Sequence, residues 1–111
     1  MGAGALRAAA GLIDALRVRW ADQPDERLLA AYARDRDPHA LAALVARHGP
    51  AVWAVCRRLL RCPHDAEDAF QTTFLALVRG APTLRATGTV GGWLYGVAVR
   101  TAAKSRAATR L

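Results

Sequence analysis

The sequence has few cysteines, few aromatic residues and no long apolar run, and each scarcity excludes a class of protein. Its 111 residues contain two cysteines, too few for a framework of disulfides. No stretch approaches the roughly 18 apolar residues of a membrane-spanning helix, and the N-terminus lacks the apolar core of a signal peptide. A hydrophobic content of 53% excludes a disordered chain. We therefore expect one cytoplasmic domain without a membrane partner.

Signatures of catalysis and metal binding are also missing. There is no glycine-rich phosphate loop, no HExxH motif and no evident pair of nucleophile and base, so we expect no enzymatic activity and no cofactor. Cys56, Cys62 and His64 follow an unusual C-x5-C-x-H spacing without an evident fourth ligand. We interpret Cys56 as a small core residue and Cys62 as a helix-end residue, and we expect no metal site.

Alternation of period two is absent, which leaves helices and loops. The predicted fold is all-α, a compact bundle of about four helices over residues 25–111. An N-terminal extension, residues 1–24, is expected to be helical over 4–20 and loosely attached. The next helix should run from Asp25 to Asp35, and Asp37 should cap the one after it. Gly49-Pro50 is expected to stop or kink that helix before it resumes toward Leu60.

Residues 65–78 predict an amphipathic helix, with Asp65 as its N-cap and Glu67 and Asp68 in its first turn. At about 100° per residue its two faces separate clearly. The inner face holds Ala66, Phe70, Thr73, Phe74 and Leu77, and the outer face holds Asp65, Asp68, Gln71, Thr72 and Leu75. After a loop from Gly80 to Gly92, a last helix should begin near Trp93, with Trp93, Leu94, Val97 and Thr101 pointing inward.

Charge is unevenly distributed along the chain. The formal net charge is +7, yet residues 64–78 carry three acids and no Lys or Arg, and residues 79–111 carry six basic residues and no acid. Lysine occurs once among 16 basic residues, and the arginine and alanine bias has a simple explanation in a GC-rich genome. The placement of the charges is more informative and suggests two surfaces with different partners.

Each surface has a simple structural explanation and a functional one. The acids could merely complement a helix dipole, but this does not account for Gln71 or the exposed Leu75, whereas a partner rich in arginine would. The basic third could be a solvated helix. Trp93 and Tyr95 interleaved with arginines instead fit a nucleic acid, whose bases stack on aromatic rings while its phosphates bind cations.

From Asp25 to about Arg110 the chain resembles region 2 of bacterial RNA polymerase sigma factors, especially the extracytoplasmic-function (ECF) group. Three stretches carry the resemblance. "ALAALVARHGPAVWAVCRRLL" is similar to the first core helices of the family, "DAEDAFQTTFLALVR" to its "DAEDxxQxxFLxxWR" stretch, and "VGGWLYGVAVRTAAKSRAATR" to its "WLYxIAxNxxxDxxRR" helix. We expect no counterpart of the family's second helical domain, region 4, which binds the minus-thirty-five element.

The resemblance implies partners and site residues. Core RNA polymerase, through the clamp helices of its largest subunit, would contact Asp68, Gln71 and Thr72. We expect Asp65 and Leu75, on the same face of the helix, to contribute as well. Promoter DNA, through the non-template strand of the minus-ten element, would contact the loop from Thr83 to Gly92 and Trp93, Tyr95, Arg100, Lys104, Arg106 and Arg110. An anti-sigma factor is a further implied partner. The chain departs from the family pattern at Thr72, where Glu is usual, and at Arg100 and Lys104, where Asn and Asp are frequent.

Three functions are compatible with the sequence. The first is a sigma-type module that binds polymerase and recognises and melts the minus-ten element in transcription initiation. The second is a helical interaction protein that docks on polymerase without initiating. The third is a nonspecific basic DNA-binding domain.

Overall fold

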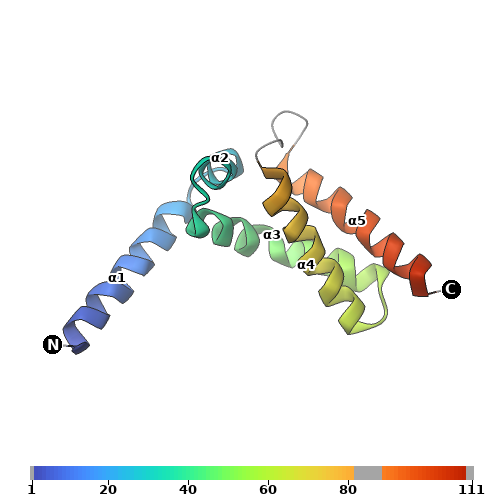
Figure 1. Cartoon of the computed structure of the whole chain (residues 1–111), viewed down its shortest axis with the longest axis horizontal. Helices are drawn as coiled ribbons and strands as arrows, with labels where there is room; N and C mark the ends of the chain where they lie inside the picture. Colours follow the sequence, from blue (N-terminus) through green and yellow to red (C-terminus); the bar gives the residue numbers. More distant parts are fainter. Residues whose placement is uncertain (1, 82–88, 110–111) are drawn as a thin grey trace. The chain divides into compact units, whose positions relative to one another are not determined.

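The computed structural model describes residues 2–81 and 89–109, with the side chains at 6, 10, 12–19 and 109 outside the description, and the regular structure among them is helical. The helices are α1 (Gly2–Ala21), α2 (Asp25–Asp35), α3 (Pro38–Leu59), α4 (Pro63–Gly80) and α5 (Val90–Thr109) (Figure 1). The all-α prediction is confirmed. The chain divides into two compact units, Met1–Leu44 and Val45–Leu111. The division between residues 24 and 25 that the sequence suggests stays a prediction.

The first unit contains α1, α2 and the first turns of α3. Helix α2 begins after Pro24 and is followed by its C-cap residue, Arg36, which has a left-handed backbone (φ 51°) and whose N–H donates to the Tyr32 carbonyl oxygen. The Arg36 guanidinium also lies 5.0 Å from the centre of the Tyr32 ring, a cation–π contact that covers the helix end. Leu28, Leu29, Ala31 and Tyr32 are buried.

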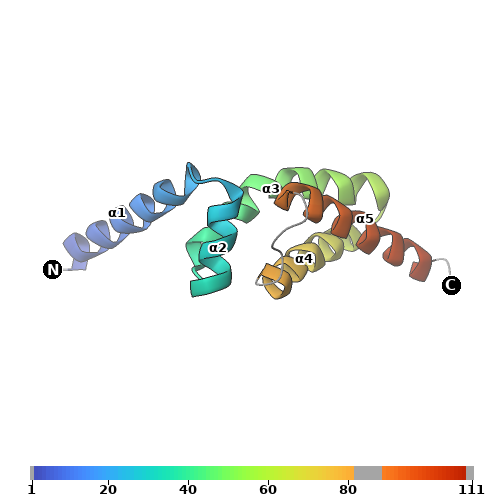
Figure 2. The ribbon, with the colours of Figure 1, turned by 90° about the horizontal axis from the view of Figure 1, so that it is seen from above.

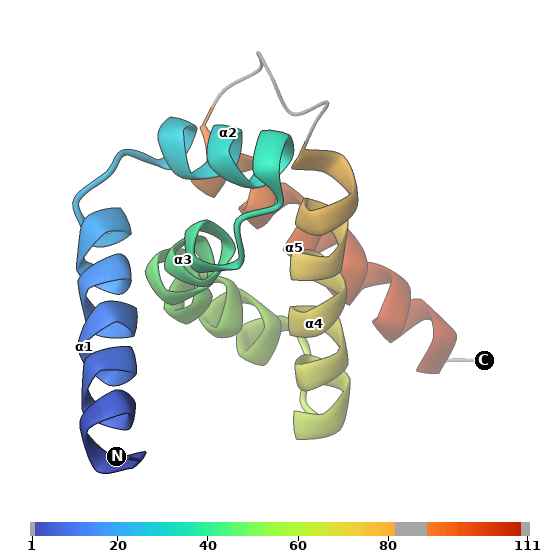
Figure 3. The same cartoon turned by 60° about the vertical axis from the view of Figure 1, so that its left-hand side comes forward.

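Asp37 caps α3 as the sequence predicts. Its Oδ1 accepts hydrogen bonds from the backbone N–H groups of His39 (2.9 Å) and Ala40 (3.4 Å), which satisfies two amides that have no partner within the helix. The short turn between α2 and α3 that holds this cap is visible in Figure 3.

Helix α3 does not stop at Gly49-Pro50 but continues to Leu59. Proline removes one amide donor from the helix, and the backbone angle that its ring imposes is itself helical. Gly49 is buried, and a Cβ at this position would lie 3.7 Å from the Phe70 ring. The dipeptide therefore lies where α3 contacts Phe70 of α4, within the second unit.

Helix α4 begins at Pro63, two residues before the predicted start. Cys62 occupies the N-cap position without a side-chain hydrogen bond, and Pro63 occupies the first turn, where its fixed φ and missing N–H suit a helix start. The prediction of Asp65 as N-cap is therefore wrong. Of the three acids, only Asp65 lies in the first turn, so the placement of Glu67 and Asp68 there is also wrong.

Helix α5 begins at Val90, so its predicted start near Trp93 is wrong by three residues. Thr89 caps it: its Oγ1 accepts a 3.0 Å hydrogen bond from the Gly92 N–H, and its carbonyl accepts one from the Trp93 N–H. Gly91 and Gly92 therefore belong to the helix. Residues 82–88, which make up most of the predicted DNA-contacting loop, lie outside the described residues.

Helices α4 and α5 lie side by side in the second unit (Figures 1 and 2). The buried side of α4 holds Ala66, Ala69, Thr73, Phe74 and Leu77, as predicted apart from Ala69 and the half-buried Phe70. The buried side of α5 holds Val90, Leu94, Ala98 and Ala102, whereas the predicted inward residues Trp93, Val97 and Thr101 are half-buried. The inner side of α5 is thus rotated from the predicted one.

An aromatic cluster extends this core toward the surface. Phe70 lies between Phe74 and Trp53, with ring centres 5.1 Å and 6.0 Å away, and the Trp53 ring meets it edge-on, a favourable geometry for aromatic pairs. In the part of the chain that the structure describes, no helix is both long and apolar enough to cross a membrane.

Candidate functional site

The exposed side of α4 carries four of the five residues predicted to bind polymerase. Asp68, Gln71, Thr72 and Leu75 are exposed, and we call this set the docking face; Asp65 is half-buried at its edge. The spacing of these four residues is i, i+3, i+4 and i+7, which places them on one side of a helix. Thr73 and Leu77, on the other side, are fully buried, so the core fixes the direction in which the docking face points.

The docking face is mixed in chemistry. Leu75 has 51% of its surface exposed and lies beside a carboxylate, an amide and a hydroxyl. Glu67 is exposed as well but lies about 100° around the helix from Asp68. The three acids of α4 therefore do not form one acidic surface. Asp68 is the acid that lies fully on the docking face, so the predicted acidic face consists chiefly of this residue.

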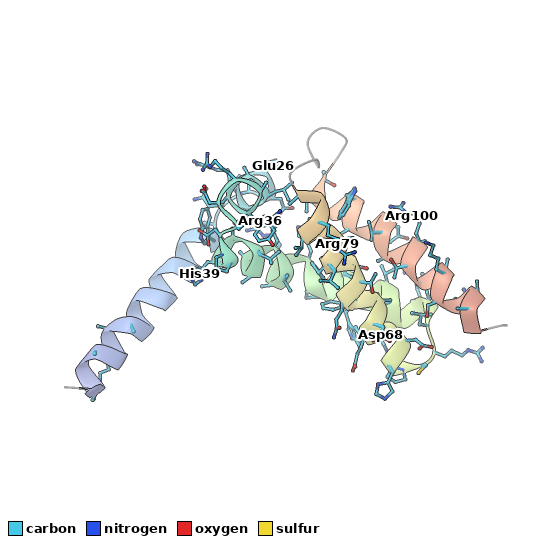
Figure 4. The ribbon with its side chains drawn as sticks, viewed as in Figure 1. Glu26, Arg36, His39, Asp68, Arg79 and Arg100 are labelled. Carbon is cyan, nitrogen blue, oxygen red and sulfur yellow. The ribbon has the colours of Figure 1, made fainter. Side chains whose placement is uncertain are left out.

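Arg79 is an exposed residue of this same side that the sequence analysis assigned to the basic third. It lies eleven residues after Asp68, close to three full helical turns. Figure 4 shows Asp68 and Arg79 toward opposite ends of α4. The side of α4 is therefore negative near its start and positive at its end. The eleven-residue spacing from Asp68 is enough to predict that Arg79 lies on this side of the helix.

The predicted DNA-binding residues of α5 fall on two edges of the helix. At about 100° per residue, Trp93, Arg100 and Lys104 lie within about 40° of one another, and Tyr95 and Arg106 lie roughly opposite them. We call the first set the basic edge and the second the tyrosine edge. The charged members and Tyr95 are exposed. Arg110 lies outside the described residues.

The two aromatic residues differ in how freely they could stack with a base. Trp93 is half-buried, and a Cβ at Gly80 would lie 3.6 Å from its ring, so the indole rests against the end of α4. Tyr95 has 52% of its surface exposed. Tyr95 is therefore the more accessible ring, and Trp93 is tied to the core.

A histidine that the sequence analysis did not assign to the site lies against the start of α5. A Cβ at Gly91 would lie 3.3 Å from Cε1 of the His48 ring. His48 comes from α3, so this contact, like that of Trp93 with Gly80, fixes the position of the first turn of α5. No pattern in the sequence pairs these two residues.

The cysteines occupy different environments. Cys56 is fully buried, and burial raises the pKa of its thiol by disfavouring the thiolate. Cys62 is exposed at the start of α4. Among the described residues, no three side chains of metal-binding type gather in one place.

Comparison with known proteins identifies the family. The sigma-70 region 2 family matches residues 44–110. The chain belongs to this family. It is 33% identical over 78 residues to the ECF RNA polymerase sigma factor SigM of Mycobacterium tuberculosis strain H37Rv, and 32% identical to SigM of strain Erdman. The predicted assignment to ECF-type sigma region 2 is confirmed.

The match covers 70% of this chain but 39% of each SigM protein. The chain therefore spans about two fifths of the length of these relatives. No solved structure matches it.

Proposed function

We propose that this sigma region 2 binds core RNA polymerase through the docking face of α4 and promoter DNA through α5. The observation that carries the proposal is the direction of α4: one side is fixed in the core, and the other exposes Asp68, Gln71, Thr72 and Leu75 together. Membership in the sigma-70 region 2 family supports the same assignment.

The chemistry of the docking face suits an arginine-bearing helical partner such as the polymerase clamp. Asp68 would accept charge-assisted hydrogen bonds from a guanidinium, and Gln71 can donate and accept through its amide. Leu75 would supply an apolar contact between them, in the manner of an interface core surrounded by polar groups. Thr72 offers a hydroxyl where the family usually has Glu, so one ion pair of the family would be absent.

The chemistry of α5 suits DNA. In the described part of the chain the charged side chains of α5 are Arg100, Lys104 and Arg106, all basic and exposed. Arginine and lysine on a helix bind phosphates, and the exposed Tyr95 offers a ring on which an unpaired base could stack. We infer that α5 contacts the non-template strand of the minus-ten element during initiation.

Binding to core polymerase tests the docking face. Asp68→Arg combined with Gln71→Ala should abolish co-purification with core enzyme, because attraction to an arginine becomes repulsion worth several kcal/mol. The fold should survive, since both side chains are exposed. Glu67→Arg is the matched control: it reverses an exposed acid of the same helix on another side, and core binding should persist.

Retention of core binding by the double variant, with an unchanged circular dichroism spectrum, would contradict the docking role. In vitro transcription then separates the remaining alternatives. Promoter-specific transcripts from the reconstituted complex support initiation. Core binding without such transcripts supports an interaction protein that docks only, and DNA binding without core binding supports a nonspecific DNA-binding domain.

A further inference from the structure

Gly96 lies inside α5, directly beneath the side chain of Arg100. A Cβ at Gly96 would lie 3.2 Å from Nη1 of Arg100 and 3.9 Å from its Cζ. Arg100 follows Gly96 by four residues, and side chains in a helix lean toward the N-terminus over the preceding turn. The guanidinium therefore lies back along α5 toward its first turns and occupies space that any other residue at 96 would begin to fill. Figure 4 marks Arg100 on this helix.

Neither the backbone nor the core explains a glycine at this position. Gly96 has ordinary helical angles, and among the described residues only the end of the Arg100 side chain comes within 4 Å of the Cβ position. Glycine in a helix interior is less stable than alanine, because it loses more backbone entropy on folding. The fold would therefore accept alanine here, and stability does not account for the glycine.

We propose that Gly96 is a positioning residue that holds Arg100 in the orientation needed to bind a phosphodiester of the DNA strand. This inference rests on the proposed DNA role of α5. A Cβ at position 96 would lie 3.2 Å from Nη1 of Arg100, so a side chain there would displace the guanidinium from this orientation. Held in place, the guanidinium fork can make paired hydrogen bonds to the oxygens of one phosphate.

The basic residues of α5 near Gly96 favour an anionic ligand. The nearest ionisable neighbours along α5 are Tyr95, Arg100 and Lys104, and no acid follows Asp68 in the sequence. Around the axis of α5, Gly96 lies between the basic edge and Tyr95. Tyr95 lies roughly opposite Arg100 around α5, so a phosphate held by Arg100 would bind away from the tyrosine ring.

A double-mutant cycle tests the proposal. Gly96→Ala and Gly96→Leu are compared in the native background and in an Arg100→Ala background, each as the full chain bound to core polymerase. The probe is a fluorescent, mixed-sequence single-stranded oligonucleotide. In the native background we expect binding to weaken by about 3-fold for Ala and about 10-fold for Leu. Each loss is smaller than the full contribution of one charge-assisted hydrogen bond. In the Arg100→Ala background neither change should weaken binding further.

Thermal unfolding separates positioning from damage to the fold. Gly96→Ala should raise the Tm by about 3–6 °C through helix propensity while it weakens DNA binding. Gly11→Ala is the control, because a Cβ at this exposed position of α1 would meet nothing within 4 Å. It should favour the helix in the same way and leave DNA binding unchanged.

Three results would overturn the proposal, and each would do so for a different reason. Native-like DNA binding by both Gly96 variants, with weakened binding by Arg100→Ala, would show that Arg100 acts without help from Gly96. Equal losses in both backgrounds would show that Gly96 acts independently of Arg100. Unchanged binding by Arg100→Ala would remove the DNA role of Arg100 itself, and with it this inference, while the docking face of α4 would stand on its own test.

Discussion

At the scale of single residues, burial separates Cys56 from Cys62. Cys56 is fully buried and Cys62 is exposed. The thiolate is the reactive form of cysteine, and desolvation disfavours it at Cys56, which raises the pKa of that thiol. The sequence analysis assigned the first to the core and the second to a helix end, and the structure confirms both assignments.

We expect the two thiols to react at different rates. In the native protein at pH 8, iodoacetamide should modify Cys62 readily and Cys56 only as fast as the fold opens. In denaturant both should react. Mass spectrometry of the alkylated chain over time measures the two rates. Equal rates under native conditions would show that Cys56 is accessible and that its placement in the core is wrong.

The same pKa shift gives the stability of the fold a defined dependence on pH. Because the folded state binds the Cys56 proton more tightly than the unfolded chain, this contribution is complete below the unfolded pKa of about 8.5. It is lost as the pH rises from there through the raised pKa of the folded state. Cys56→Ala should lower stability near neutral pH by leaving a small cavity, and the difference from wild type should narrow at alkaline pH in denaturation curves measured across this range.

At the scale of helices, the start of α5 depends on one hydroxyl. Thr89→Ala removes the acceptor for the Gly92 N–H, and loss of such a cap should cost about 1 kcal/mol. Thr89→Ser keeps the oxygen and should restore most of this loss. Chemical denaturation of the wild type and the two variants measures the difference. Equal stability of the wild type and the Thr89→Ala variant would mean that the hydrogen bond contributes nothing to the fold.

The packing of α4 against α5 uses small residues. Ala98 and Ala102 are fully buried on the inner side of α5, which lets the two helices approach closely. Ala98→Leu should therefore force them apart or strain the core, at a cost of roughly 1–3 kcal/mol. Ala103→Leu adds the same atoms on an exposed position of α5 and should change stability little. A smaller loss for Ala98→Leu than for Ala103→Leu would show that the inner side of α5 is assigned incorrectly.

Helix types were predictable from the sequence, as were both ends of α2 and the Asp37 cap of α3. The starts of α4 and α5 and the inner face of α5 were not. The outer side of α4 follows from apolar spacing, because Phe74 and Leu77 contrast strongly with Asp68 and Gln71. In α5 the bulk of Trp93 leads to the prediction that it points inward, whereas it is half-buried in the structure. The buried alanines give no such contrast, since alanine is common on both sides of this helix.

The helix starts were missed for related reasons. Pro63 and Thr89 are each good residues for a helix start, but the predicted starts lie at the later Asp65 and Trp93. The orientation of Arg100 could not be predicted either. It depends on the absence of a side chain at Gly96. The types of the two residues alone do not predict where the guanidinium of Arg100 lies.

At the scale of the whole molecule, the uneven charge gives the DNA hypothesis a quantitative form. The net charge of +7 favours any nucleic acid in a general way. Specific phosphate contacts would instead come from individual residues, and the basic residues of α5 that we propose for this role lie on two edges of the helix. A measurement that counts contacts can therefore distinguish a binding edge from a merely positive protein.

A salt titration measures the number of phosphate contacts. On core polymerase, the affinity for a fluorescent single-stranded oligonucleotide should fall with salt at a slope of about −0.7 per phosphate contact. Arg100→Ala combined with Lys104→Ala removes the two charges of the basic edge and should flatten the slope by about 1.4, twice that increment. Wild type should also prefer the single strand to duplex, as expected of a surface that holds a displaced strand.

The control removes the same number of charges elsewhere. Arg57 and Arg58 are exposed in the last turn of α3 and belong to neither edge of α5. If net charge alone governed binding, Arg57→Ala with Arg58→Ala would flatten the slope as much as the α5 pair; if phosphates contact the basic edge, the slope should stay as in wild type. Equal slopes for all three proteins, or equal affinity for duplex and single strand, would contradict the proposed role of α5 in holding a displaced promoter strand. The protein would then be one that docks on polymerase without contacting the promoter strand through α5.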